Sequence, residues 1–427
     1  MSDKITSELN ELLKADIVTE ETAEKIRQYF RQKEQGNQNK ISSVFGILGA
    51  ILVGLGIILV FAHNWDNLSR ATKTIVSFLP LITGQFLCGY SLLKKTESAI
   101  WKETSSVFLF FAIGASISLI GQVYNIPGTI DSFLITWMLL SLPLVYLLKS
   151  SIVSLLYLSG ITYYGCNTNY FTYPKTNSYY YWILLSGIAP HYYSLLKTKG
   201  HSNFTLFHNW FISLSIVICL GTIANEYGSL IYLSYMSLFT IFYFIGKIPF
   251  FDKQKLKNNC FLIIGKLGIL YLLLLYSFRW FWEKPIYKTA SLSETFLSVE
   301  FLIALVLTLI AAILFYNENN KKKLRDLSLL DIAFLTNILH FINGYEFSIV
   351  ANLIVLFIGI AEIKRGTKLN HLGILNFGLL LITALVTCRF FDSDLSFVLR
   401  GILFIAIGLG FFLANYFILK KRNRNEK

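Results

Sequence analysis

The chain has 427 residues, of which 54% are hydrophobic and only 15% charged, and it carries a formal net charge of +13. Soluble domains contain about 25% charged residues, and a water-soluble fold of this size could not hide so much apolar surface. Most of the basic residues lie in short connectors between apolar stretches, which argues against the dense basic face of a nucleic-acid-binding protein. The composition therefore predicts an integral membrane protein whose partner is the lipid bilayer and not a nucleic acid.

The first 42 residues are polar and charged, unlike the rest of the chain. Thr19, followed by Glu20 and Glu21, has the residue types of a helix N-cap with acids in the first turn. We expect residues 1–42 to form a cytoplasmic helical hairpin and a polar linker, with narrow apolar faces that suit packing on a partner protein. No signal peptide is expected ahead of the first apolar run. The two apolar stripes are Ile5, Leu9, Leu12 and Leu13, then Ala23, Ile26, Tyr29 and Phe30.

The transmembrane domain is predicted over residues 43–419, which divide into fourteen apolar stretches of about 16–24 residues. A membrane-spanning helix needs roughly 20 apolar residues, whereas barrel strands are about ten residues long and alternate in polarity. We therefore predict an all-α polytopic membrane helix bundle with about fourteen transmembrane helices. The stretches are 43–63, 72–93, 105–122, 132–148, 151–166, 179–196, 204–223, 228–246, 259–278, 297–316, 327–342, 347–363, 371–388 and 396–419.

The connectors between these stretches are alternately rich and poor in lysine and arginine. Connectors on one side, with the two termini, hold 29 of these residues, and connectors on the other side hold 7. Basic residues near membrane spans stay in the cytoplasm. The count therefore predicts a multi-pass protein with both termini cytoplasmic, including the basic tail 420–427.

Small residues and prolines occur within several of the predicted spans. Gly46, Ala50 and Gly54 recur every four residues on one face of the first span, and Gly114 and Ser118 do the same in the third. Such faces let helices approach closely. Kinks are expected where prolines fall within spans, because neighbouring helices can satisfy the freed carbonyl groups. These prolines are Pro80, Pro143 and Pro190.

Polar and aromatic residues follow the first and third spans at ends that face outward in this topology. They are Asn64, Trp65 and Asp66 after the first span, and Gln122 and Tyr124 after the third. Aromatic residues at the interface are most often membrane anchors. The alternative is a shared outer-face site whose polar groups bind a head group, a sugar or an ion.

Four charged residues lie within predicted spans or at their ends. Burial of a charge in a membrane is costly, which makes each of them a functional candidate. Structural explanations compete, because a long lysine side chain can reach the interface and a charged outward connector at 389–395 favours a local ion-pair network. The candidates are Lys266, Asp331, Glu300 and Arg400.

Motifs for catalysis and cofactor binding do not occur. The sequence lacks the common phosphate-binding, dinucleotide, metalloprotease and hydrolase signatures. The five cysteines and six histidines show no metal-ligand spacing, so we expect no metal site, no cofactor and no catalytic residue. The short connectors also disfavour an enzyme.

Several local motifs resemble a family of bacterial predicted membrane proteins, domain of unknown function 2157. The likeness extends over 47–149, with a similar opening segment at 16–21 and a closing segment at 400–415. That opening usually has glycine where this chain has Asp16. The resemblance implies a bacterial inner-membrane location and assigns no activity. The motifs are Gly54-Leu55-Gly56, Ala62-His63-Asn64-Trp65, Gly121-Gln122-Val123-Tyr124, Trp137 and Leu142-Pro143-Leu144.

Two functions fit these features. The first is a transporter or flippase-like permease, favoured by many kinked, glycine-rich helices with few soluble parts. The second is a non-transporting membrane scaffold or envelope-associated component that docks through its amino-terminal hairpin, favoured by the scarcity of buried charge.

The predicted topology can be tested with reporter fusions. We expect a reporter fused after Asn225 or Asn343 to lie outside the cytoplasm, because both connectors belong to the side poor in lysine and arginine. Alkaline phosphatase activity at these two positions checks this. A cytoplasmic reporter at either one would overturn the span count or the orientation.

Overall fold

A computed structural model describes most of the membrane domain and parts of both ends. The described residues are 9, 11–13, 15, 18–28, 44–49, 51–53, 55, 56, 59, 68–171, 179–224, 230–283, 296–319, 328–341, 347–390, 396–398, 401, 402, 404–406, 408–410, 412 and 416. Predictions for Asn64, Trp65, Asp66, Arg400, the linker after residue 30 and the tail 420–427 lie outside this set.

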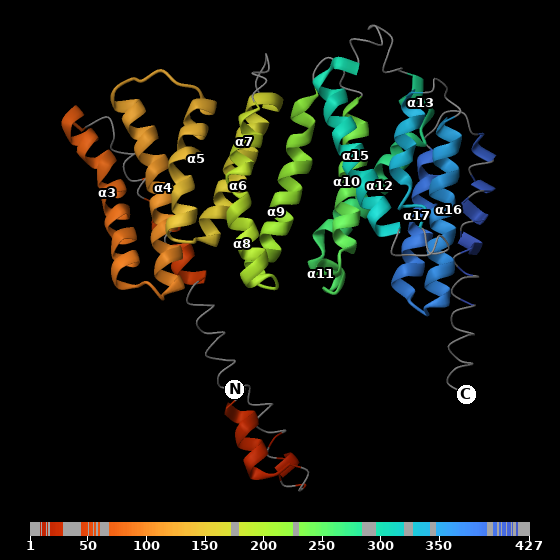
Figure 1. The fold of residues 1–427 in the computed structure, drawn as a ribbon, viewed down its shortest axis with the longest axis horizontal. Helices are drawn as coiled ribbons and strands as arrows, with labels where there is room; N and C mark the ends of the chain where they lie inside the picture. Colours follow the sequence, from red (N-terminus) through yellow and green to blue (C-terminus); the bar gives the residue numbers. More distant parts are fainter. Residues whose placement is uncertain are drawn as a thin grey trace. The chain divides into compact units, whose positions relative to one another are not determined.

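The described residues form helices and turns and contain no strand, as predicted. The chain divides into two compact units, Met1–His208 (unit 1) and Asn209–Lys427 (unit 2) (Figure 1). Within the described residues, seven helices are long and apolar enough to cross a membrane. An all-α membrane protein is confirmed, whereas fourteen spans and their orientation stay predictions. The seven helices are α3 (Arg70–Lys94), α4 (Ala99–Val123), α5 (Ile130–Leu147), α9 (Asn203–Leu220, extended by η3, Gly221–Ile223), α15 (Val299–Asn319), α16 (Phe347–Lys368) and α17 (Leu372–Phe390).

The amino-terminal helix starts where the sequence indicates. Residues 20–28 are helical, and the Thr19 hydroxyl accepts a hydrogen bond from the Thr22 amide at 3.4 Å. Leu9 and Ala23, one from each predicted stripe, are buried. Both observations agree with two short helices that share an apolar face.

Several helices of unit 1 begin at a serine or threonine cap, whereas α7 (Tyr180–Ser186) and α8 (Ala189–Lys199) have no side-chain cap. Ser69, Ser98, Thr129 and Ser150 each accept a hydrogen bond from a backbone amide in the first turn of the following helix. Such side chains satisfy amides that no intrahelical carbonyl can reach. The caps explain why α6 (Ser151–Cys166), which η2 (Asn167–Phe171) extends, begins at the predicted residue.

Close packing of α4 depends on small residues, as predicted. A Cβ atom added at Gly114 would lie 2.6 Å from the Trp137 ring of α5, and one added at Gly46 would lie 3.2 Å from the Thr104 hydroxyl. The Trp137 indole also donates to the Phe110 carbonyl at 2.8 Å. These glycines allow contacts that a larger residue would block.

The predicted span 179–196 is broken into α7 (Tyr180–Ser186) and α8 (Ala189–Lys199). Pro190 lies at the start of α8, where its missing amide costs no helical hydrogen bond. Tyrosine hydroxyls of neighbouring helices bond the carbonyls beside the break: Tyr157 donates to Leu184 at 3.0 Å, and Tyr146 donates to Gly187. The expected satisfaction of freed carbonyls by neighbouring helices is therefore observed.

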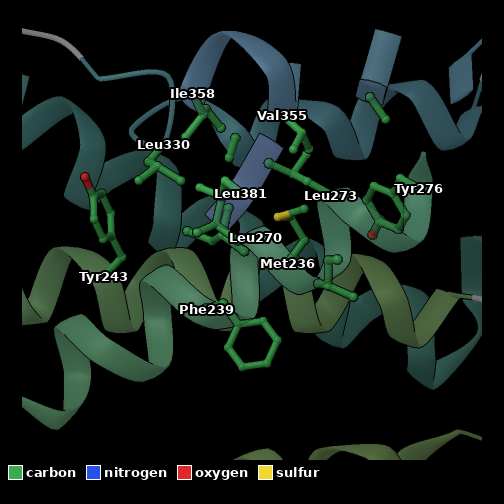
Figure 2. Packing of buried hydrophobic residues seen from close by; sticks show 14 of the residues in the cluster. Met236, Phe239, Tyr243, Leu270, Leu273, Tyr276, Leu330, Val355, Ile358 and Leu381 are labelled. Atoms are coloured by element: carbon green, nitrogen blue, oxygen red, sulfur yellow. The ribbon is translucent and has the colours of Figure 1, made fainter. Parts of the chain in front are cut away.

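The core of unit 2 joins α10 (Ile231–Lys247), α12 (Cys260–Tyr276), α16 and α17 (Figure 2). Two glycines bring α10 and α12 together, because an added Cβ would lie 2.5 Å from backbone at Gly246 and 2.4 Å at Gly265. Gly359 and Gly378 do the same for α16 and α17. The remaining elements are α11 (Pro249–Asp252), η5 (Leu256–Asn258), α13 (Arg279–Glu283) and η7 (Ala333–Phe341).

One predicted span differs. Over 327–342 we expected an α-helix, but the described part is a turn followed by the 3₁₀ helix η7. Long 3₁₀ helices are uncommon, and polar side chains here compete for the backbone hydrogen bonds of a regular helix. The Asp331 carboxylate accepts from the Ser328 amide at 2.8 Å, and the Thr336 hydroxyl donates to the Ala333 carbonyl at 2.6 Å.

Candidate functional site

A cluster of uncharged polar side chains lies between α10, α15 and η7 in unit 2. The Asn337 amide nitrogen donates to the Ser237 hydroxyl at 2.9 Å and the Leu233 carbonyl at 3.2 Å, and lies 3.5 Å from the Thr308 hydroxyl. The Ser237 and Thr308 hydroxyls are hydrogen-bonded at 2.8 Å. One side chain from each of three elements therefore meets at one point, which we call the Asn337 cluster.

The cluster lies midway along a helix that is long and apolar enough to cross a membrane. Thr308 is the tenth of the 21 residues of α15, a helix of about 30 Å at 1.5 Å per residue. Apolar side chains pack on both sides of the cluster along the axis of α10. Leu230, Leu233 and Ala304 pack together on one side, and Ile241, Ala311 and Phe334 on the other.

Two buried polar atoms lack a hydrogen bond to any described residue, one in the cluster itself and one on Ser234, three residues before Ser237 in α10. In the part of the chain that the structure describes, no partner reaches the Asn337 Oδ1 or the Ser234 hydroxyl, although only 4% of Asn337 and none of Ser234 is exposed. A buried polar atom without a partner costs about 1–3 kcal/mol. The cluster can therefore accept further hydrogen bonds from a bound molecule.

The Lys266 candidate forms an ion pair. Its ammonium group lies 2.7 Å from the Glu362 carboxylate of α16 and 4.3 Å from the centre of the Phe377 ring. Glu362 is buried, and Arg365 lies 3.9 Å from its other oxygen. The sequence identified Lys266 but not its partner, which stands at the end of a predicted span.

The Asp331 candidate also forms an ion pair, with Lys247 at the end of α10. Lys247 lies 4.1 Å from the centre of the Tyr243 ring, so a cation–π contact adds to the pair. Asp331 and Asn337 therefore attach the segment 328–341 to α10 at two points, one charged and one neutral. Glu300, the third candidate, is buried in the first turn of α15.

The described residues contain no group of three histidine, cysteine, aspartate or glutamate side chains that could hold a metal ion. The side chains of the Asn337 cluster have no acid or base that titrates near neutral pH. The cluster can bind by hydrogen bonding.

Comparison with protein families covers the first third of the chain. Residues 10–154 match the family model of predicted membrane proteins, DUF2157. The resemblance inferred from the motifs is confirmed over this segment. No curated protein and no solved structure matches the chain. The Asn337 cluster lies outside the matched segment, so the family description says nothing about it.

The outer-face candidates belong to the DUF2157 segment. The Tyr124 hydroxyl lies 3.1 Å from the Thr74 hydroxyl, and the Arg70 guanidinium lies 5.8 Å from the centre of the Tyr124 ring. Tyr124 thus contacts the first turns of α3. Gln122 lies in the last turn of α4. Whether these residues form a site with Asn64, Trp65 and Asp66 stays a prediction, since these three are outside the described residues.

The same segment contains a half-buried carboxylate that the sequence did not single out. Glu103 of α4 accepts hydrogen bonds from the Ser151 amide at 2.8 Å, the Ile152 amide at 3.1 Å and the Ser150 hydroxyl. It therefore caps α6, where a negative charge also complements the helix dipole. Its three hydrogen bonds indicate a structural role.

The Lys247–Asp331 pair can be tested through protein stability. We expect Lys247→Met or Asp331→Leu alone to destabilise the protein by about 3 kcal/mol, because each leaves a largely buried charge without its partner. The double variant should recover most of the loss, since two apolar side chains replace the pair. Thermal unfolding of the purified variants measures this, and additive losses in the double variant would contradict a direct pair.

Proposed function

We propose that the protein is a permease-type transporter for a small polar solute, with the Asn337 cluster as its intramembrane binding site. The observation that carries this proposal is Asn337 itself. Its amide joins α10 and α15 from a segment that is not α-helical, and its Oδ1 has no partner among the described residues. Transporters often bind substrates where a helix is interrupted near the centre of the bilayer.

Non-α-helical backbone supports this proposal. At membrane depth it is tolerated where it is buried in protein or lines a water-filled cavity. The turn and 3₁₀ helix over 328–341 meet this condition on one side, where Leu330, Ala333, Phe334 and Asn337 are buried, whereas Leu335 and Ile338 are exposed. A segment that lacks regular α-helical hydrogen bonds can rearrange at lower cost than an α-helix.

The chemistry of the cluster favours an uncharged solute. Its side chains are an amide and hydroxyls, and the charged groups of the described part of unit 2 that lie nearest along α10 are held in the Lys247–Asp331 pair. An ionised solute would lose its hydration without a compensating charge. A solute with a hydroxyl or amide donor satisfies Oδ1 of Asn337 and the Ser234 hydroxyl.

Buried charges weaken the alternative of a non-transporting scaffold. That alternative rested on their scarcity, yet Glu300, Asp331 and Glu362 are all buried. We propose a bacterial inner-membrane location, which the motif resemblance implies, with both termini cytoplasmic, which the distribution of lysine and arginine favours.

Water access to the cluster is the decisive test, because it does not require the solute to be known. In a variant without the five native cysteines, we expect Ser234→Cys to react with a membrane-impermeant methanethiosulfonate reagent in sealed vesicles. A transporter opens its site to each side in turn, so both vesicle orientations should react.

Ala311→Cys is the matched control. It is fully buried in the neighbouring apolar layer and should react in neither orientation. If the reagent labels neither cysteine, the permease proposal is wrong. Mass spectrometry of the labelled protein gives the readout.

A further inference from the structure

A second site, unrelated to the Asn337 cluster, lies in unit 1. A cavity of about 620 Å³ is formed by the helical residues 44–53, α3 and α4. This volume is within the roughly 300–1,000 Å³ typical of ligand sites. Its walls include Gly49, Val53, Leu79, Pro80, Trp101 and Phe108.

A glycine on the first helix and a proline on α3 explain why the helices separate here. At Gly46 the first helix lies against Thr104 of α4, but a Cβ atom added at Gly49, less than one turn later, would meet nothing within 4 Å. On the facing helix, Pro80 lacks the amide that would continue the hydrogen bonding of α3. The nearby Ser77 carbonyl accepts from the Ser116 hydroxyl of α4 at 2.7 Å, which holds α3 against α4 just before Pro80.

The walls suit a hydrocarbon chain. The lining is almost entirely apolar, and the Ser105 hydroxyl is bonded to the Trp101 carbonyl of its own helix at 2.7 Å. Val53 and Leu79 are more than half exposed in the protein alone, so this cavity is covered by the bilayer. Lipid chains are its immediate surroundings, and water gains no hydrogen bonds there.

One end of the cavity is basic. Trp101 marks this end, 40% exposed and in edge-to-face contact with Tyr90 at 5.3 Å. Lys94 and Lys95 end α3, and Lys102 lies in the first turn of α4. Tryptophan is typical of the head-group level, and basic residues beside a membrane cavity bind anionic lipid head groups.

The acidic residues at the same end do not cancel this charge. Glu103 is occupied by the amino end of α6 through the amides of Ser151 and Ile152. Glu97 is exposed in the connector between α3 and α4. Of the two carboxylates at this end, only that of Glu97 is not hydrogen-bonded to α6, so three lysines give this end a net positive charge.

We propose that this cavity binds an anionic phospholipid, with one acyl chain between the first helix, α3 and α4 and the phosphate group at Lys94, Lys95 and Lys102. The site is independent of the transport proposal and would hold for a protein of either function. It makes the DUF2157 segment a lipid-recognising part of the chain.

Native mass spectrometry of the full-length protein tests the proposal, with phosphatidylglycerol and phosphatidylcholine of identical chains as probes. We expect the wild type to retain phosphatidylglycerol preferentially. Lysine-to-glutamine changes at the three positions should weaken retention by roughly fivefold for each lysine, the effect of one basic residue near an anionic surface. Equal retention of both lipids, or no effect of the three changes, would overturn the anionic head group.

A filled cavity tests the acyl chain separately. Gly49→Phe adds a side chain where no neighbour stands and should abolish phosphatidylglycerol retention. Gly89→Phe is the matched control, because an added Cβ at Gly89 also meets nothing within 4 Å, and this residue is on the face of α3 opposite the cavity residue Leu87. Equal retention by the two variants would overturn the cavity as the binding site.

Loss of folding must be separated from loss of binding. Each variant is first compared with the wild type by size-exclusion elution. If Gly49→Phe does not fold, Val53→Trp fills the same cavity from an exposed position and replaces it in the comparison. Retained binding in Val53→Trp would then count against the proposal.

Discussion

Hydrogen bonding of polar groups in a medium without water is the constraint on which this structure depends. In hydrocarbon each backbone amide and carbonyl must find its partner within the protein, which leaves helices as the main element. Departures from regular helix then need side chains to replace the lost partners. At the break after α7, Tyr146 and Tyr157 provide them. Irregular backbone and polar side chains therefore occur together.

The link between irregular backbone and polar side chains explains which parts of the fold the sequence could predict. Apolar length and capping residues are local, so the stretch 151–166 was placed correctly after Ser150. The stretch 327–342 is equally apolar on average but forms η7, because Ser328, Asp331 and Thr336 bond to the nearby backbone. Average hydropathy does not detect side chains that compete for the backbone hydrogen bonds of a helix. The spacing of these polar residues was the sequence signal that could have indicated an irregular helix here.

The candidate site was predictable only in part. Lys266 and Asp331 were visible because a charge in an apolar stretch is rare. Their partners are 96 and 84 residues distant in the sequence, and nothing local identifies them. Single serines and threonines in apolar helices usually bond to their own backbone, as Thr240 does to the Met236 carbonyl. Ser237 and Thr308 look the same in the sequence, and only the fold brings them to Asn337.

The distribution of polar groups along the helices follows the cost of burying them. Lys247 is the last residue of α10, where its charge is nearest to water, whereas Thr308 stands midway along α15. A charge is most expensive at the centre of the bilayer, and a neutral amide or hydroxyl much less so. In the described part of unit 2, this neutral cluster therefore lies midway along α15 and the Lys247–Asp331 pair at a helix end. The segment 328–341 carries both Asp331 and Asn337, so one stretch of chain holds the charged pair at the end of α10 and the neutral cluster nearer the middle of that helix.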